Sequence, residues 1–99
     1  MKDALSLASR LRIPEGVLSH NLQGEEVILN LGTGTYFGLD RVSTRIWHLI
    51  RERQSLHKVL DRLLEEYDVA EAPCAQDLLN LVAQMRKNGL VEICDGTAP

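Results

Sequence analysis

The chain has few of the residues on which several classes of protein depend. Only 4% of its 99 residues are aromatic, so it offers few rings on which nucleic-acid bases could stack. Its two cysteines, Cys74 and Cys94, lie far apart in the sequence and form no CxxC pair. Without a secretion signal, we expect both thiols to be reduced. The sequence therefore predicts neither a disulfide framework nor a zinc site.

Long apolar runs and an excess of positive charge are also missing. No stretch of 18 apolar residues occurs, which predicts that no helix crosses a membrane. The first twelve residues lack the apolar segment of a signal peptide. The net charge of −3 disfavours a nucleic-acid partner, because that binding depends on neutralising phosphates. We therefore expect a cytoplasmic protein that contacts neither nucleic acid nor membrane.

The first part of the chain is typical of short strands joined by tight turns. We expect strands at residues 17–22, 25–31 and 35–39, with turns at 23–24 and 32–34. Turn-linked neighbours of this kind favour an antiparallel meander.

Within these strands, alternation assigns residues to faces. One face of the second strand takes Val27, Leu29 and Leu31, and the other takes Glu26, Ile28 and Asn30. This alternation predicts a half-buried strand. In the third strand, Thr35, Phe37 and Leu39 share one face, whereas Tyr36 and Gly38 share the other.

The remaining two thirds of the chain predict three helices. Asp40 suits the N-cap of the first helix and Ser55 that of the second. Apolar residues recur at helical spacing in the first helix, at Val42, Ile46, Leu49 and Ile50, beside Trp47. The second helix has the strongest amphipathic pattern: Leu56, Val59, Leu60, Leu63, Leu64 and Tyr67.

A third helix is expected over residues 74–88. Pro73 suits its first position, and Gly89 suits the position that ends it. Its apolar face consists of Leu78, Leu81, Val82 and Met85. After it, Leu90, Val91 and Ile93 are expected to close the core as an extended tail.

Three strands followed by three helices predict an α+β, winged-helix-like fold with a three-stranded antiparallel sheet. The length fits one domain, which we place at residues 13–94, with flexible tails at 1–12 and 95–99. A winged helix that reads DNA usually ends with its wing hairpin, whereas here the strands come first. A DNA-binding winged helix that uses residues 74–88 remains an alternative.

The sequence contains no recognisable catalytic or metal-binding group of residues. His20, His48 and His57 have neither the spacing of a pair on one helix face nor that of a zinc site. Glu25 and Glu26 are adjacent and point to opposite faces of a strand, so they are a poor acid/base pair, and we expect both to be solvated. We therefore predict no enzymatic activity, no metal and no cofactor.

The strand at residues 35–39 lies at an edge of the predicted sheet. It has neither the lysine nor the proline that commonly protects an edge. An exposed edge beside an apolar helix face can accept an extended peptide as a further strand. Alternatively, a loop or the N-terminal segment covers the edge, or a second copy pairs with it, so the chain is expected to be a monomer or a weak homodimer.

Several motifs in order resemble the PqqD family. Tyr36-Phe37-Gly38-Leu39-Asp40 precedes a helix containing Ile46-Trp47, and a second helix ends near Tyr67. A third helix contains Asp77-Leu78-Leu79 and is followed by Gly89-Leu90-Val91. The resemblance extends from about residue 17 to residue 93.

The resemblance implies a domain that binds the leader segment of a ribosomally made, post-translationally modified precursor peptide (a RiPP). In that family the leader adds as an antiparallel strand to the third strand and lies against the third helix. The peptide-binding residues implied here are Thr35, Tyr36, Phe37, Gly38, Leu39, Asp77, Leu78, Leu81, Val82, Met85 and Arg86. Phe37 and Met85 equally suit the core. Either edge of the third helix, Leu79/Arg86 or Leu81/Gln84, could face the peptide.

Two branches of the family fit the sequence. The Gly-X-Tyr-Phe hairpin is similar to free-standing proteins of lasso-peptide clusters, which implies a leader peptidase and a cyclase as partners and a Tyr-X-X-Pro element in the leader. The alternative is the peptide carrier of pyrroloquinoline quinone biosynthesis, which works with a radical SAM enzyme. Residues 12–16 match the Arg-Leu-X-Pro-Gly start of that branch only loosely.

Overall fold

Five strands and three helices form the part of the chain that the computed structural model describes, residues 5–53 and 55–94. Of the tails expected at 1–12 and 95–99, residues 1–4 and 95–99 lie outside the described residues. In chain order the elements are β1 (Arg10–Arg12), β2 (Val17–Leu22), β3 (Glu25–Asn30), β4 (Thr35–Gly38), α1 (Arg41–Arg53), α2 (Leu56–Glu66), α3 (Glu71–Lys87) and β5 (Glu92–Cys94). This order confirms the predicted α+β class.

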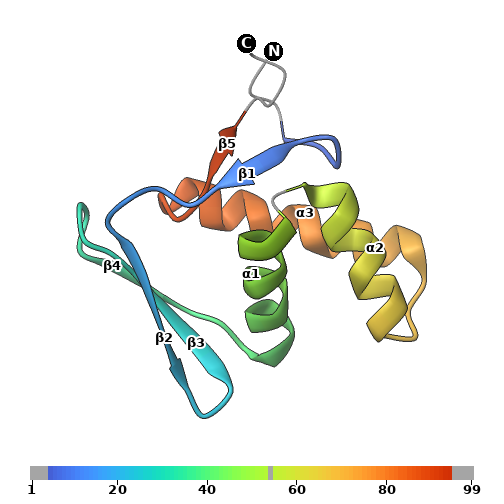
Figure 1. Ribbon diagram of the computed structural model, residues 1–99, viewed down its shortest axis with the longest axis horizontal. Helices are drawn as coiled ribbons and strands as arrows, with labels where there is room; N and C mark the ends of the chain where they lie inside the picture. The colour runs from blue at the N-terminus through green and yellow to red at the C-terminus, as the bar shows by residue number, and fades with distance from the viewer. Residues whose placement is uncertain (1–4, 54, 95–99) are drawn as a thin grey trace.

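The strands form two separate antiparallel sheets. β2, β3 and β4 form the predicted meander in that order, and β1 pairs with β5. Figure 1 shows the meander on one side of the helices, with the β1–β5 pair above them. β4 therefore lies at one edge of its sheet, as the sequence predicted.

The N-terminal segment contributes a strand that the sequence did not predict. Leu11 pairs with Ile93 across the small sheet and is only 1% exposed. Residues 10–12, which the sequence analysis assigned to a flexible tail, therefore form a strand. A three-residue strand is too short for alternation to reveal it, and its partner lies about 80 residues further along the chain.

The face of β3 that packs against the core is the one with Glu26 and Ile28. The alternation of apolar residues suggests the other face, with Val27 and Leu29. Ile28 is fully buried and Glu26 is 4% exposed, whereas Leu31, just past the strand, is 58% exposed. Val27 and Leu29 are only half-buried. The more uniformly apolar face of the strand therefore points away from the helices.

The predicted cap of α1 is confirmed, and that of α2 only in part. The Ser43 backbone N–H donates to Asp40 Oδ1 at 2.8 Å, which satisfies one of the free donors of the first turn. Ser55 occupies the N-cap position of α2 with extended backbone angles, but its side chain makes no capping hydrogen bond.

α3 begins three residues earlier than predicted. Its first residue is Glu71, so Pro73 lies in the first turn rather than at the first position. Proline is tolerated there because backbone N–H groups of the first turn have no partner within the helix. The predicted stop is confirmed: Gly89 has φ +74°, and the N–H of Leu90 donates to the Met85 carbonyl at 2.9 Å.

One hydrophobic core joins the sheet, the helices and the C-terminal segment. Its buried residues are Leu11, Ile28, Leu39, Ile46, Trp47, Leu49, Ile50, Leu56, Val59, Leu60, Leu63, Leu78, Val82, Met85, Leu90 and Val91. Burial of Leu90 and Val91 confirms that this segment closes the core. Two residues of the predicted helix stripes lie at the surface, since Val42 is 49% exposed and Tyr67 is 37% exposed.

Candidate peptide-binding site

The outer edge of β4 presents backbone groups that are not used by its own sheet. The Leu39 N–H donates to the Glu26 carbonyl at 2.9 Å, and Phe37 lies opposite Ile28. Hydrogen-bonded and non-hydrogen-bonded pairs alternate along an antiparallel ladder, so Leu39 and Phe37 direct their backbone groups toward β3. Tyr36 and Gly38 consequently direct their N–H and C=O groups toward the open edge.

The side chains of β4 divide between the two faces of the sheet as predicted. Leu39 is buried, and Phe37 is half-buried and packs against the core. Tyr36, on the other face, is 72% exposed. Thr35 begins the strand next to the turn, where Thr33 Oγ1 accepts a hydrogen bond from its backbone N–H at 3.2 Å.

The predicted residues of α3 separate into core and surface. Leu78, Val82 and Met85 are at most 1% exposed, so their side chains are occupied by the core. Of the two roles left open for Met85, the structure favours the core.

The other three α3 positions can be reached from outside. Asp77 is exposed, and Leu81 and Arg86 are half-buried. Phe37 of β4 and Leu81 of α3 both pack against the same core. Contacts between α3 and a peptide would therefore fall to Leu81 and the two charged side chains.

An apolar hollow between α1, α2 and α3 includes residues that the sequence analysis did not select. It is lined by Val42, Ile46, Leu63, Tyr67, Val69, Pro73, Cys74, Asp77 and Leu78. The sequence analysis placed Val42 and Tyr67 on the apolar helix faces, because helical spacing alone does not show which residues of such a face are buried. Burial and the charge of Asp77 raise the pKa of the Cys74 thiol, which favours its unreactive protonated form.

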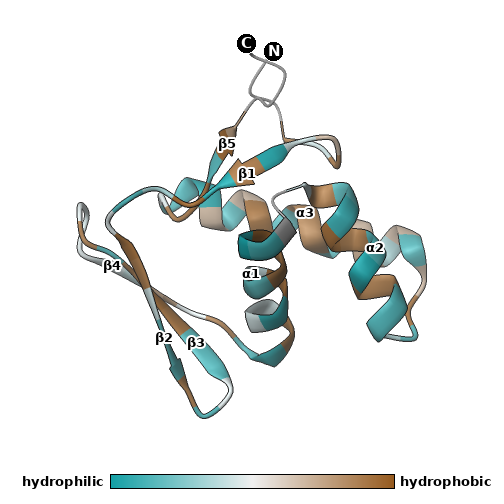
Figure 2. Ribbon diagram, in the orientation of Figure 1, coloured by the Kyte–Doolittle hydropathy of each residue, from teal (hydrophilic) through white to brown (hydrophobic). Residues whose placement is uncertain are grey.

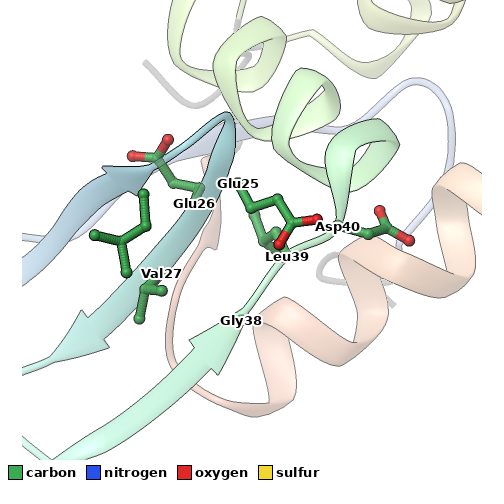
Figure 3. A pocket seen from close by; sticks show the side chains of 7 residues that line it. Glu25, Glu26, Val27, Gly38, Leu39 and Asp40 are labelled. Atoms are coloured by element: carbon green, nitrogen blue, oxygen red, sulfur yellow. The ribbon is translucent and has the colours of Figure 1, made fainter.

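A shallower hollow lies where β4 leads into α1. Its lining comprises Leu22, Glu25, Glu26, Val27, Gly38, Leu39 and Asp40. Figure 3 shows the Glu25 carboxylate directed away from that of Glu26, as alternation along a strand requires. Hydrogen bonds from Ser43 lower the pKa of Asp40, so this end of the edge is acidic.

Glu26 is buried, which corrects the expectation that both glutamates are solvated. Its carboxylate accepts a hydrogen bond from Asn21 Nδ2 at 3.1 Å and lies 3.1 Å from His48 Nε2. Burial raises the pKa of Glu26, but hydrogen bonds from Asn21, His48 and Ser19 outweigh it and lower the pKa below its usual value. The charged group thereby fixes the end of β3 against α1, next to the open edge of β4.

The described residues contain no group of three or more histidine, cysteine, aspartate or glutamate side chains able to hold a metal ion. Among the helices described, none has the length and apolarity needed to span a bilayer.

Comparisons with known proteins show which family the chain resembles. The family model described as Coenzyme PQQ synthesis protein D (PqqD) matches residues 25–91. The solved structure of "TbiB1 in Complex with the TbiA(beta) Leader Peptide" is similar to the chain, with 36% identity and a TM-score of 0.78 over 82% of this chain and 94% of that one. A search of curated proteins found no match.

A second solved structure, "Lasso peptide synthetase B1 complexed with the leader peptide", has the same fold. It is 22% identical, with a TM-score of 0.75 over 83% of this chain and 96% of that one.

Proposed function

Since the chain belongs to the PqqD family, we propose that it binds the leader segment of a ribosomally made precursor peptide by strand addition to β4. The observation that carries this proposal is the open edge, where Tyr36 and Gly38 direct unused backbone groups outward. A second strand pairing there would use the same hydrogen-bond pattern as β3 uses on the other side.

Affinity at this edge comes first from the backbone. Tyr36 and Gly38 each offer one donor and one acceptor, and a net hydrogen bond in water is worth about 0.5–1.5 kcal/mol. Four such bonds supply about 2–6 kcal/mol before the cost of ordering the peptide. Side-chain contacts must therefore add affinity, and they determine which leader is bound.

Specificity follows from the alternation of the added strand. Residues that lie directly opposite each other share a face of the sheet, so the leader residue opposite Phe37 points toward the core side. Phe37 and Leu81 are half-buried and pack against the core, and we expect their side chains to contact this leader residue. We infer that this leader position is apolar, and that Asp77 and Arg86 contact charged leader residues at the rim.

The proposed role is that of a carrier without enzymatic activity of its own, acting in the cytoplasm where such precursors are made. Two structures similar to the chain are named as leader-peptide complexes, and one of them is described as that of a lasso peptide synthetase. We therefore favour a lasso-peptide pathway, in which the carrier delivers the precursor to a leader peptidase and a cyclase. The family description favours a second candidate, a carrier for a radical SAM enzyme in pyrroloquinoline quinone biosynthesis.

Replacing Gly38 tests strand addition directly. Gly38→Pro removes the outward N–H and places a ring on the open edge, while the ladder to β3 is retained. Gly38→Ala is the matched control, because an added Cβ meets nothing within 4 Å. With a fluorescently labelled leader from the precursor encoded beside this chain, anisotropy should show at least tenfold weaker binding for Gly38→Pro.

The control should bind the leader within twofold of the wild type. Equal affinity of Gly38→Pro and wild type would place the peptide elsewhere on the chain. Failure of the wild type to bind at about 100 μM would contradict leader recognition itself, because a working carrier needs roughly micromolar affinity.

A further inference from the structure

The strand β4 is held in place through its neighbour β3. It pairs with β3 along one side, and its other side is the open edge to which we assign the leader. The position of β4 relative to α3 therefore depends on how β3 is attached to the helices. Contacts near both ends of β3 provide this attachment.

The first attachment joins the start of β3 to α1. The Glu26 backbone N–H donates to Thr44 Oγ1 at 2.9 Å, and the Glu26 carboxylate lies 3.1 Å from His48 Nε2. The Glu26 carbonyl also accepts a hydrogen bond from the Leu39 N–H, where β4 leads into α1. One end of the open edge is therefore tied to α1.

The second attachment is made by Asn30, the last residue of β3. Its Nδ2 group donates to the Gly89 carbonyl at 2.9 Å, which joins β3 to the glycine that follows α3. Its Oδ1 atom accepts hydrogen bonds from the backbone N–H groups of Gly32 and Thr33, at 2.8 and 3.2 Å. One half-buried amide group thus connects the β3–β4 turn to the end of α3. Figure 2 shows this turn at the far end of the meander from the start of α1.

The backbone around Gly89 is suited to this contact. Its N–H donates to the Arg86 carbonyl at 3.0 Å, and the Leu90 N–H donates to the Met85 carbonyl at 2.9 Å. These bonds fix the Gly89 carbonyl, to which Asn30 donates. A Cβ added to Gly89 would lie 2.7 Å from Asn30 Nδ2, so the lack of a side chain allows the close approach.

The two attachments lie at opposite ends of the proposed leader-binding edge. Asn30 is paired with Thr35, the first residue of β4, whereas Glu26 is bonded to Leu39 just past its last residue. At about 3.4 Å per residue, the two attachments are about 14 Å apart along β3. Two points so far apart resist rotation of the hairpin about either one. Without the Asn30 contact, the hairpin would stay attached at Glu26 and could pivot away from α3 at its Thr35 end.

We propose that Asn30 is a positioning residue for leader binding, which holds β4 through Gly89 at the distance from α3 that the leader requires. This inference rests on the proposed function and adds to it a residue that acts without touching the leader. When the contact is lost, part of the molecules have β4 displaced from α3 and do not bind. The apparent affinity then falls with the fraction that remains competent. The loss appears in the association rate, because binding now requires a conformational change.

The substitution Asn30→Asp isolates the contact with Gly89. Aspartate keeps an oxygen for the N–H groups of the turn but has no donor for the Gly89 carbonyl. Asn88→Asp is the matched control, because Asn88 Nδ2 donates to the Gln84 carbonyl at 2.8 Å, within the end of α3. It makes the same chemical change one residue away from Gly89 without a bond to the sheet. The probe is the synthetic leader of the precursor encoded beside this chain, immobilised for biolayer interferometry.

We expect Asn30→Asp to lower the association rate constant at least fivefold, while the dissociation rate constant stays within twofold of the wild type. Asn88→Asp should match the wild type within twofold in both constants. Thermal unfolding followed by circular dichroism gives the folded fraction of each variant, to which the association rates are referred. If Asn30→Asp does not fold, Asn30→Ser gives the same comparison. Its hydroxyl can accept a hydrogen bond from the turn but is too short to reach Gly89.

Four results would overturn the inference in different ways. Unchanged association by folded Asn30→Asp would reject the positioning role and leave the proposed function standing. Faster dissociation with unchanged association would mean that Asn30 contacts the leader directly. Equal slowing by Asn88→Asp would assign the effect to the added charge at the end of α3. Failure of the wild type to bind the leader would reject the proposed function, and the inference with it.

Discussion

The carboxylate of Glu26 lies 3.1 Å from Nε2 of His48, and this contact joins the end of β3 to the middle of α1. Thr44 of the same helix adds a second link, since its Oγ1 accepts a 2.9 Å hydrogen bond from the Glu26 backbone N–H. The Glu26 carbonyl in turn holds Leu39 at the end of β4. A buried polar group thus positions the strand to which we assign peptide binding.

Removing the charge of Glu26 should weaken the attachment of β3 to α1. Glu26→Gln loses charge-assisted hydrogen bonds, each worth about 1.5–3 kcal/mol, so the free energy of unfolding at pH 7 should fall by about 1–3 kcal/mol. Glu25→Gln is the control, because Glu25 is adjacent but exposed. Urea unfolding measures both, and equal stability of the two variants would contradict a structural role for Glu26.

The same variant carries a pH prediction. Because the folded-state pKa of Glu26 lies below its usual value of 4.5, its ionised form stabilises the fold above about pH 4.5. The contribution is lost as the pH falls below that value, when the carboxyl group protonates. The stability difference between wild type and Glu26→Gln should therefore shrink as the pH falls below 4.5. If the stability difference instead grew in acid, the ionised form of Glu26 would not be the form that stabilises the fold.

Gly89 allows strain and steric overlap to be separated. It has φ +74°, and an added Cβ would lie 2.7 Å from Asn30 Nδ2. Gly16 has φ +87° but nothing within 4 Å of an added Cβ. Gly16→Ala should cost about 1 kcal/mol for the backbone alone, and Gly89→Ala should cost more. Equal losses of stability in thermal unfolding would show that Asn30 moves aside freely.

The sequence predicted the order of the elements but not which face of β3 is buried. Alternation has a period of two whichever side faces the core, and Val27, Leu29 and Leu31 are the more apolar set. The choice depends on residues outside β3: Asn21 and His48 provide hydrogen bonds for Glu26, and Ile28 belongs to the core that residues of α1 also form. Such partners are not visible in a local pattern.

In the candidate site too, the sequence predicted the position of the strand edge but not the burial of the helix residues. The open edge at residues 35–38 was predictable from the turn, the missing lysine and the strand order. The α3 positions were selected by family position and helical spacing, which identify an apolar face but not its depth. Consequently Leu78, Val82 and Met85 belong to the core, while Leu81 reaches the surface.

Leu11 should contribute to stability although it precedes the domain limit expected from the sequence. It is 1% exposed and pairs with Ile93 in the β1–β5 sheet. Leu11→Ala should lower the free energy of unfolding by about 2–5 kcal/mol, as large-to-small changes in a core do. Leu18→Ala, at an exposed position, should cost less than about 1 kcal/mol. Equal urea midpoints for the two variants would show that β1 is dispensable.

Met85 and Leu81 distinguish the core of α3 from its peptide-facing side. Met85→Ala should cost about 2–5 kcal/mol of stability, because the side chain is fully buried. Leu81→Ala should cost less, since Leu81 is half-buried, but it should weaken leader binding several-fold. Urea unfolding and leader anisotropy on the same samples separate the effects, with affinities referred to the folded fraction. If Leu81→Ala binds the leader as the wild type does, the peptide lies along the other edge of α3, beside Leu79 and Arg86.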